Sequence, residues 1–490
     1  MAIAAETFFL VPGALGTLQQ QIQQTVAESI VSGRFRPGEK LPSSRRLAQH
    51  LGVSRITVTL AYTELVAGDY LRARGRSGYY VSETAPKQPE FAPVQIPRGE
   101  VVDWTRITGT RFSRQLFFSR PPDWRSYPFP FLYGQADATL FDHQNWRQCA
   151  LRALGMRDFE TLTADFYERD DPMLIEYIAR AILPRRGISA RPEEILLTLG
   201  AQNALWLSAQ VLLGPRRTAA MENPCYPGLR SILGQTSCRT VSVDVDDQGL
   251  PPEALPQGVD VVFTTPSHHC PTNATLPLAR RIALLQRAAR EDFLIVEDDY
   301  EFEMSFFRPS LPALKSLDEE GRVVYVGSFS KSLFPGLRLG YLVGAEPFIR
   351  EARALRAAVL RHPPGHTQRT VAYFLSLGHY DALLNRMAQA YKRRRLAMDE
   401  AIRAEGLTQA GPGGFGGSSV WMAAPAGVDT DDLALALRRR GVLIDPGRLF
   451  FAPEAAPRNT YRLAYSSIPH TRIAEGIGLI AGALRETGPR

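Results

Sequence analysis

One lysine of the chain, Lys331, has neighbours that suit an amine nucleophile. It follows the apolar run RVVYV in the segment GSFSKSLFPGLRLGY, with Ser328 and Ser330 close to it and Arg338 seven positions later. A lysine in a desolvated pocket loses its proton more easily and then attacks carbonyl groups. Hydroxyl groups and a guanidinium suit a phosphate dianion. The segment therefore favours a reactive lysine beside a phosphate, whereas a lone lysine after a strand is usually a solvated surface residue.

Carboxylates follow a second apolar run, FLIV, in the segment EDDYEFE. Such carboxylates could bind a metal ion or act as a general acid pair. A third use is to pair with a pyridoxal cofactor, whose ring is an electron sink only while its nitrogen keeps a proton. We assign this role to Asp298 and a hydrogen bond to the cofactor's phenolic oxygen to Tyr300. We expect Asp299 and Glu297 to be structural.

Two further apolar runs end in residues that suit the same cofactor. After EEILLTL, a glycine opens the helical stretch GAQNALWLSAQVLL. The exposed N–H groups of Ala201 and Gln202 at that helix start form an anion site for a phosphate. After RTAAME, in NPCYPG, Tyr226 is placed to stack on the pyridine ring. Together with Lys331, these segments predict one site for pyridoxal 5′-phosphate (PLP).

An α/β fold is needed to bring these residues together. From about residue 114 onward, short apolar runs alternate with helical stretches and turns, which is typical of a mostly parallel sheet. Ligands of such sheets bind at the carboxyl ends of the strands. The predicted strands are EEILLTLG, RTAAME, VDVVFTT, FLIVED, RVVYVGS and GYLVGA.

The first 82 residues have a different, basic character and hold more than half of the chain's net charge of +7. Apolar residues recur at helical spacing over residues 17–33. Two shorter helices, SRRLAQHL and SRITVTLAYTELVAG, have serine caps and are separated at Gly52, which is typical of a helix-turn-helix. The next segment, DYLRARGRSGYYVSE, predicts a two-stranded wing with a basic tip. The alternative is an ordinary three-helix lobe with an exposed basic face.

The run GRFRPGEKLPSSRRLAQHLGVSRITVTLAYTELVAGDYLRARGRSGYYV resembles the winged helix of the GntR family of bacterial regulators. In that family the recognition helix enters the major groove. The resemblance implies base contacts from Ser54, Arg55 and Thr57, and a DNA contact from Arg45. We expect Arg55 to donate bidentate hydrogen bonds to a guanine.

Other residues of this surface are expected to contact the DNA backbone. Arg46, Arg74 and Arg76 are assigned to phosphate groups, which gives affinity and salt dependence without sequence information. Gly78 lets the backbone of the wing approach the minor groove. The expected partner is double-stranded promoter DNA with direct or inverted repeats.

The whole chain, from about Gly16 to about Leu484, resembles the MocR subfamily of GntR regulators, in which a fold-type I aminotransferase domain follows the winged helix. The matching segments include GQADATLFDHQNW, ENPCYPG, TPSHHCPTN, VEDDYEFE, GSFSKSLFPGLRLGY and NTYRLAYSSIP. The resemblance implies Lys331 as the aldimine lysine, Asp298 and Tyr300 as cofactor partners, and Arg338, Ser328 and Ser330 on the phosphate side. It also implies that Arg462 binds the carboxylate of a substrate or effector, with a surface ion pair as the alternative.

Two single positions depart from this subfamily, and the segment YERDDP (residues 167–172) replaces its typical glycine-rich segment. Asn273 stands where it usually has glycine, and Gly228 stands where members that respond to GABA carry arginine. The effector is therefore open among GABA, taurine, ectoine-derived amino acids, D-alanyl peptides and PLP itself.

The sequence predicts three parts: a DNA-binding domain (1–82), a linker (83–113) and a PLP-binding effector domain (114–490). The linker contains Pro86, Pro89, Pro93 and Pro97, a composition that favours extended chain. An irregular strap packed on the larger domain is the alternative for its second half.

Composition excludes several classes of protein. No apolar stretch approaches the roughly 18–20 residues of a membrane span, and the N-terminus lacks the basic region of a secretion signal. The cysteines are scattered, which argues against a structural zinc site or a disulfide scaffold. They are Cys149, Cys225, Cys238 and Cys270. We expect a cytoplasmic protein with no metal site.

We therefore predict a transcriptional regulator that senses a small amine or amino acid when the effector displaces Lys331 by transaldimination. The effector has to bind two states of the protein with different affinity. A homodimer is expected, because fold-type I domains generally dimerise. An active aminotransferase with an accessory DNA-binding module is the alternative, and half-reactions are chemically feasible. Intact Lys331, Asp298 and Tyr300 argue against a degenerate domain without cofactor.

Overall fold

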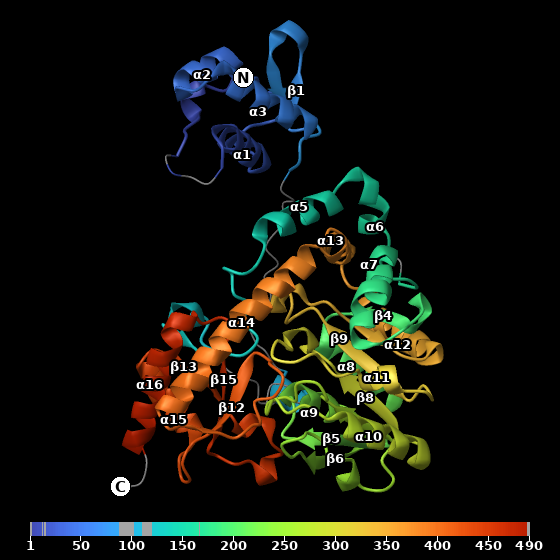
Figure 1. Ribbon diagram of the computed structural model, residues 1–490. Helices are drawn as coiled ribbons and strands as arrows, with labels where there is room; N and C mark the ends of the chain where they lie inside the picture. The colour runs from blue at the N-terminus through green and yellow to red at the C-terminus, as the bar shows by residue number, and fades with distance from the viewer. Residues whose placement is uncertain are drawn as a thin grey trace. The chain divides into compact units, whose positions relative to one another are not determined.

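The computed structural model describes residues 2–11, 13, 16–87, 102–109, 120–165 and 167–487. The chain divides into two compact units, Met1–Thr110 and Arg111–Arg490 (Figure 1). Most of the predicted linker, including its boundary at residue 113, lies outside the described residues. Within it the structure describes a single helical turn, α4 (Trp104–Ile107). The boundaries of the linker stay a prediction.

The first unit is a winged helix-turn-helix, as predicted. Its elements are α1 (Leu18–Val31), α2 (Ser44–Leu51), α3 (Arg55–Ala67), β1 (Leu71–Ala73) and β2 (Tyr79–Val81). Ser43 and Ser54 cap α2 and α3 with their side chains, and Gly52 ends α2 with a left-handed φ of +66°. Strands β1 and β2 pair antiparallel as the wing. The apolar faces of the three helices form a small core of their own around Val26, Leu47 and Tyr62.

The second unit is built on a seven-stranded sheet in the order β4-β10-β9-β8-β7-β5-β6. The strands are β4 (Ile195–Thr198), β5 (Thr218–Asn223), β6 (Arg239–Asp244), β7 (Val261–Thr264), β8 (Leu294–Asp298), β9 (Val323–Ser328) and β10 (Gly340–Val343). Only β10 runs antiparallel to its neighbours. All six predicted strands are present, so the mostly parallel α/β fold is confirmed. Strand β6 was missed because it is a polar edge strand with mostly exposed side chains.

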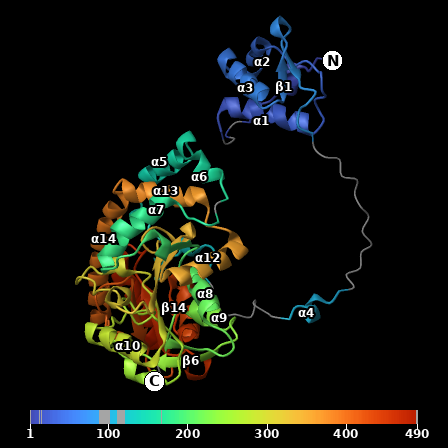
Figure 2. The ribbon, with the colours of Figure 1, turned by 90° about the vertical axis from the view of Figure 1, so that its right-hand side faces the viewer.

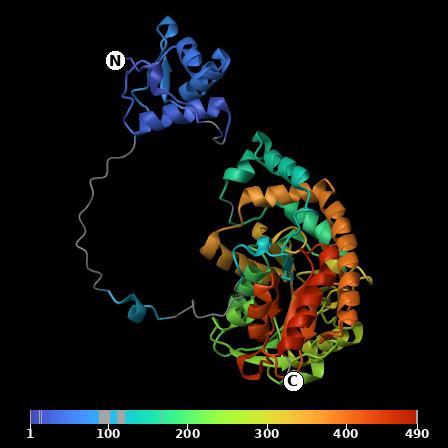
Figure 3. The ribbon, with the colours of Figure 1, turned by 90° about the vertical axis from the view of Figure 1, so that its left-hand side faces the viewer.

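Helices cover both faces of this sheet. The helices of the second unit, some of which pack on other helices or on the C-terminal strands instead, are α5 (His143–Ala153), α6 (Phe159–Thr163), α7 (Pro172–Tyr177), α8 (Ala201–Leu212), α9 (Pro227–Leu233), α10 (Leu278–Glu291), α11 (Leu314–Leu317), α12 (Glu346–Leu360), α13 (Gly365–Ser376), α14 (His379–Ala404), α15 (Thr430–Arg439) and α16 (His470–Thr487). Successive residues of a strand face opposite sides, so Leu196 packs with α8, α9 and α12 while Leu197 packs with α7, α13 and α14. Figure 2 shows α8, α9 and α12 together on one side, and Figure 3 shows the long orange helix α14 beside the red helix α16.

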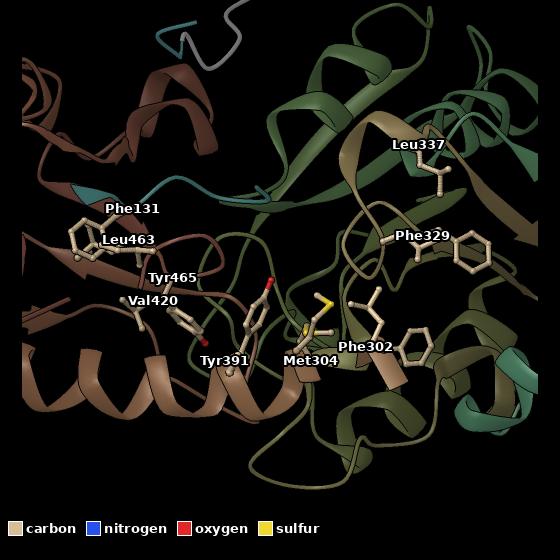
Figure 4. Close-up of a cluster of buried hydrophobic side chains, with 14 of the residues drawn as sticks. Phe131, Phe302, Met304, Phe329, Leu337, Tyr391, Val420, Leu463 and Tyr465 are labelled. Carbon is tan, nitrogen blue, oxygen red and sulfur yellow. The ribbon is translucent and has the colours of Figure 1, made fainter. Parts of the chain in front are cut away.

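A second, four-stranded antiparallel sheet lies in the C-terminal part and was not predicted. Its order is β11-β12-β15-β14, with bounds Thr408–Gln409, Ser419–Ala423, Thr460–Ala464 and Asp445–Pro446. Nearby, β3 (Phe129–Pro130) pairs in parallel with β13 (Val442–Leu443), so the start of the second unit is joined to its C-terminal part. Figure 4 shows the core that connects the two sheets, where Tyr391 of α14 and Met304 lie between Val420 and Phe329. Among the described residues, no helix combines the length and the apolar character that a membrane crossing requires.

Candidate functional site

A cavity of about 370 Å³ lies at the carboxyl ends of the parallel strands. All ten residues that the sequence assigned to cofactor and effector binding line it. They are Ala201, Gln202, Tyr226, Asp298, Tyr300, Ser328, Ser330, Lys331, Arg338 and Arg462. Nine of them come together because β4, β5, β8 and β9 end at the same edge of the sheet, and the residues at and after these strand ends face one space. Arg462 comes instead from β15 (Thr460–Ala464) in a second sheet.

Lys331 is half-buried on the wall of the cavity, just after β9. Its Nζ lies 4.1 Å from the ring centroid of Tyr133. Gly134, at a φ of +71°, leaves the space that Nζ occupies, and a Cβ at that position would collide with it. Burial lowers the pKa of Lys331 to about 8, against the opposing effect of the Glu301 carboxylate. The neutral, nucleophilic fraction of this amine near neutral pH is therefore much larger than that of an ordinary lysine.

Asp298 is buried and its Oδ1 has no hydrogen-bond partner among the described residues. Burial, together with the neighbouring Asp299 carboxylate, raises the pKa of Asp298 to about 8. An unpartnered buried acceptor is costly unless a ligand supplies the donor. The protonated ring nitrogen of PLP is such a donor, so this side of the cavity fits the cofactor.

The two carboxylates beside Asp298 have partners within the protein. Asp299 forms a buried ion pair with Arg186, from Oδ2 to Nε at 2.6 Å, and accepts a hydrogen bond from the Tyr325 hydroxyl. Glu297 accepts hydrogen bonds from the backbone N–H groups of Leu314 and Lys315. Of these three adjacent carboxylates, Asp298 is the one that lines the cavity and is available to a ligand there.

The other end of the cavity suits a phosphate group. Gly200, with a φ of +80°, precedes α8, so the helix begins at Ala201 with its first N–H groups at the cavity. A Cβ at Gly200 would come within 3.5 Å of Arg338 Nη2 and 3.7 Å of Ser330 Oγ, so the glycine keeps this corner open. Arg338 Nη2 also donates to the carbonyl of Leu199 at 3.0 Å. A helix N-terminus, a guanidinium and a hydroxyl together fit a phosphate dianion.

Three of the predicted residues have partners that the sequence did not indicate. The Tyr300 hydroxyl donates to the carbonyl of His268 at 2.9 Å, so this bond would be shared or exchanged when the tyrosine binds a cofactor oxygen. The Tyr226 hydroxyl lies 3.5 Å from Gln202 Oε1. Arg462 forms a buried ion pair with Asp445, from Nη2 to Oδ2 at 2.9 Å, so it is not the surface ion pair considered above.

Several residues of the cavity were missed by the sequence analysis. They are Arg120, Tyr133, Gly134, Gln135, Cys270, Pro335 and Phe450. Most of them lie in irregular segments that have no strand or helix period. Cys270 had a usable signal, since it follows VDVVFTT, a predicted strand that ends at the same edge of the sheet. Burial raises the pKa of the Cys270 thiol to about 11, so it stays protonated.

The structure explains the departures from the MocR pattern at Asn273 and Gly228. Asn273 adopts a left-handed φ of +61°, which a glycine accepts freely and an asparagine better than most other residues. Its side-chain amide donates to the carbonyl of Gly416 at 2.7 Å. At Gly228, a Cβ would collide with the ring of Tyr226, so an arginine there requires a different position of that tyrosine.

The predicted base contacts gather at the start of α3. Arg45 and Arg55 are exposed, and Arg55 Nε lies 3.5 Å from Ser44 Oγ. Ser54 Oγ accepts a hydrogen bond from the backbone N–H of Thr57, and the two hydroxyls lie 2.8 Å apart. Ser54 and Thr57 therefore stabilise the first turn of the helix, whereas Arg55 projects with its guanidinium exposed.

The predicted phosphate contacts lie on α2 and the wing. Arg46 is exposed and pairs with Glu6 at 3.4 Å. The guanidinium of Arg74 lies over the Tyr80 ring, 4.7 Å from its centroid. Gly78 has a φ of +103°, a conformation that favours glycine at the tip of the wing. The side chain of Arg76 lies outside the described residues.

Comparisons with known proteins match both units. The model of the bacterial regulatory proteins of the gntR family matches residues 18–81, and that of aminotransferase class I and II matches residues 140–478. The HTH-type transcriptional regulator TauR of Rhodobacter capsulatus is 63% identical over 99% of this chain and 100% of its own length. The probable rhizopine catabolism regulatory protein MocR of Rhizobium meliloti is 28% identical over 95% of this chain and 96% of its own.

A solved structure shares the fold of the second unit. LysN, an α-aminoadipate aminotransferase of Thermus thermophilus complexed with N-(5′-phosphopyridoxyl)-L-leucine, superposes with a TM-score of 0.70. It is 27% identical, and the match covers 79% of this chain and 99% of LysN. The chain therefore belongs to the GntR family of bacterial regulators, within its MocR type, and is a transcriptional regulator with an aminotransferase-like domain.

Proposed function

We propose that the second unit binds PLP through Lys331 and that a small amine or amino acid displaces this lysine by transaldimination, which changes the affinity of the first unit for promoter DNA. The observation that carries the proposal is the single cavity with a half-buried lysine, the unpartnered Asp298 and an arginine at a helix N-terminus. The phosphopyridoxyl ligand of LysN supports it.

PLP, when bound, supplies an aldehyde carbon that exchanges one amine for another and a ring that withdraws electrons. The residues of the chain hold and orient it. Asp298 keeps the proton on the ring nitrogen, and Tyr226 covers the ring. Arg338, Ser330 and the first N–H groups of α8 neutralise the phosphate. Lys331 lies over the ring of Tyr133, and the charge of the Glu301 carboxylate favours the ammonium form when the lysine is released.

The regulatory output requires that the effector bind two states of the protein with different free energy. We propose that the protein acts in the cytoplasm as a homodimer, whose two winged helices bind direct or inverted repeats of promoter DNA. In each, Arg55 reads a base, whereas Arg46 and Arg74 bind phosphate groups. The exposure of these three arginines supports this assignment.

One experiment tests both parts together. A panel of amines is titrated into the PLP-loaded protein while visible absorbance and binding to its own promoter DNA are measured in the same sample. Wild type should show linked changes in both. Lys331→Ala should show neither the lysine-bound absorbance nor the DNA response. Lys315→Ala, a matched change in α11 that is not part of the cavity, should behave like wild type.

Two results would contradict the proposal. One is a Lys331→Ala protein with unchanged absorbance and an unchanged effector response. The other is a PLP-loaded wild type whose preference for its own promoter over random DNA is the same with and without every amine.

A further inference from the structure

The cavity has a cationic end that the cofactor residues do not account for. Besides Lys331 and the phosphate-side Arg338, two guanidinium groups line its wall: those of Arg120 and Arg462. They lie with the aromatic rings of Tyr133 and Phe450 and the thiol of Cys270. Arg120 comes from the segment before β3 and Arg462 from β15, so two distant parts of the chain bring these charges together.

Arg462 is held firmly in place. Its Nε and Nη2 donate to Asp445 Oδ2 at 3.2 and 2.9 Å. Its guanidinium carbon lies 4.0 Å from the ring centroid of Tyr133 and 4.7 Å from that of Phe450. Its Nη1 lies on the side of Cys270, 4.0 Å from the sulfur. A planar guanidinium fixed in this way is pre-organised to bind a planar acid group.

Arg120 is held by one hydrogen bond, from Nη2 to the carbonyl of Tyr133 at 2.9 Å. Its Nε is buried and has no hydrogen-bond partner among the described residues. Its guanidinium is close enough to Asp445 and Arg462 for their charges to act on its pKa, which burial lowers. A guanidinium stays charged in proteins, so Arg120 carries a half-buried positive charge with unused donor capacity.

The charges at this end do not balance. Among the described residues, the carboxylate hydrogen-bonded to Arg462, whose charge also acts on Arg120, is Asp445, which is 2% exposed. Glu301 lies nearer to Lys331, where it accepts a hydrogen bond from the Tyr133 hydroxyl at 3.2 Å. Two guanidinium groups and one carboxylate leave a single positive charge. Buried charges are normally paired, so this end is complete only with one anionic group.

The ring of Tyr133 contacts both Lys331 and Arg462 of this cationic end. The Lys331 Nζ lies 4.1 Å from the Tyr133 ring centroid, and the guanidinium carbon of Arg462 lies 4.0 Å from it. The amine and the guanidinium carbon are therefore no farther apart than the sum of these two distances, which a short amino acid hydrogen-bonded to the guanidinium can span. A ligand whose amine reacts in place of Lys331 would present its acid group to Arg120 and Arg462.

We propose that Arg120 and Arg462 together bind the acid group of the effector, and that Arg120 restricts the effector class to short amino compounds with one anionic group. This inference rests on the proposed function, because it concerns the amine that displaces Lys331. A carboxylate and a sulfonate both meet the requirement. An amine without an acid group leaves the charge of Arg120 unpaired, and one with two acid groups adds a second, uncompensated anion.

The test is an absorbance titration of the PLP-loaded, full-length protein with four probes: β-alanine, 2-aminoethanesulfonate, propylamine and aspartate. Wild type should respond to β-alanine or 2-aminoethanesulfonate at concentrations about ten- to a hundred-fold below those needed for propylamine or aspartate, as expected for hydrogen bonds to charged groups. Arg120→Gln should remove most of that difference by weakening the mono-anionic probes alone. Arg120→Lys, which keeps the charge, should restore part of it.

Arg125→Gln is the matched control, because Arg125 is an exposed arginine of the same segment that is not part of the cavity. The inference is overturned if Arg120→Gln and Arg125→Gln titrate alike, or if Arg120→Gln weakens propylamine as much as β-alanine. It is also overturned if wild type responds equally to propylamine and the anionic amines, a result that leaves amine sensing intact. If none of the four probes changes the absorbance of wild type but another amine of the panel does, this inference fails while the proposed function stands.

Discussion

The reactivity of Lys331 gives the most direct quantitative prediction. Burial lowers its pKa from an ordinary value of 10.5 to about 8. At pH 7, a lysine with a pKa of about 8 is about 9% neutral, whereas a lysine with the ordinary value is about 0.03% neutral. Only the neutral amine attacks an aldehyde. At pH 7, Lys331 should therefore react with PLP about 300-fold faster than a lysine with the ordinary pKa, because about 300 times as much of it is neutral.

The assay is stopped-flow mixing of cofactor-free protein with PLP, followed by visible absorbance from pH 6 to pH 10. Each rate is divided by that of N-acetyl-lysine methylamide at the same pH, which removes the titration of the cofactor itself. The ratio should be constant up to about pH 7, should bend near pH 8 and should fall about tenfold per pH unit until the model amine titrates. Lys331→Ala should give no rapid phase.

A second perturbation tests the cause of the shift. The carboxylate of Glu301 is the main charge that favours the ammonium form of Lys331. Glu301→Gln should therefore lower the pKa of Lys331 further, and capture at pH 7 should become faster. The reasoning is refuted by a rate ratio that stays constant to pH 10, since that would mean an ordinary pKa. A Glu301→Gln protein of wild-type stability that captures PLP more slowly than wild type at pH 7 would also contradict this cause of the pKa shift.

Three further outcomes are expected. Asp298→Ala should weaken PLP binding about ten- to a hundred-fold, because a charge-assisted hydrogen bond to the ring nitrogen is lost; an absorbance titration measures it. Asp299→Ala should lower the free energy of unfolding of the second unit by about 3–5 kcal/mol, because it leaves the fully buried guanidinium of Arg186 without its carboxylate partner. Urea denaturation measures this loss, and an unchanged urea midpoint would contradict it. Arg55→Ala should cost about 1–3 kcal/mol on the specific operator and little on random DNA. Arg74→Ala should weaken both about equally and reduce the salt slope by about one. Competition binding at several salt concentrations distinguishes the two arginines.

The sequence predicted the parts of the site that follow regular strands. Lys331, Asp298, Tyr226 and Ala201 each follow a strand-like run, and the rule that parallel strands end at one edge was enough to place them together. The sequence did not indicate the ion-pair partners of the site residues. Nothing in the sequence around Arg462 indicates Asp445 as its partner, because antiparallel pairing of β14 with β15 brings them face to face.

Residues that enter the cavity from irregular segments could not be predicted in this way. Arg120, Tyr133 and Gly134 lie near β3, a two-residue strand whose only partner in the described part of the chain is the equally short β13. Two residues are too few to show a period of alternation. Strand β6 escaped for a related reason, since an edge strand with exposed side chains lacks the apolar run that marked the other strands.

The three cations around Tyr133 come from three separately anchored pieces of the fold. Lys331 follows the seven-stranded sheet, Arg462 lies in the four-stranded sheet, and Arg120 precedes β3. A short molecule held at one end through Lys331 and at the other by both arginines would bridge these three parts of the second unit. Along the chain, Arg120 closely follows the segment that leads from the DNA-binding unit. A ligand bound in this way would hold Arg120, the first described residue after that segment, in a fixed position in the second unit.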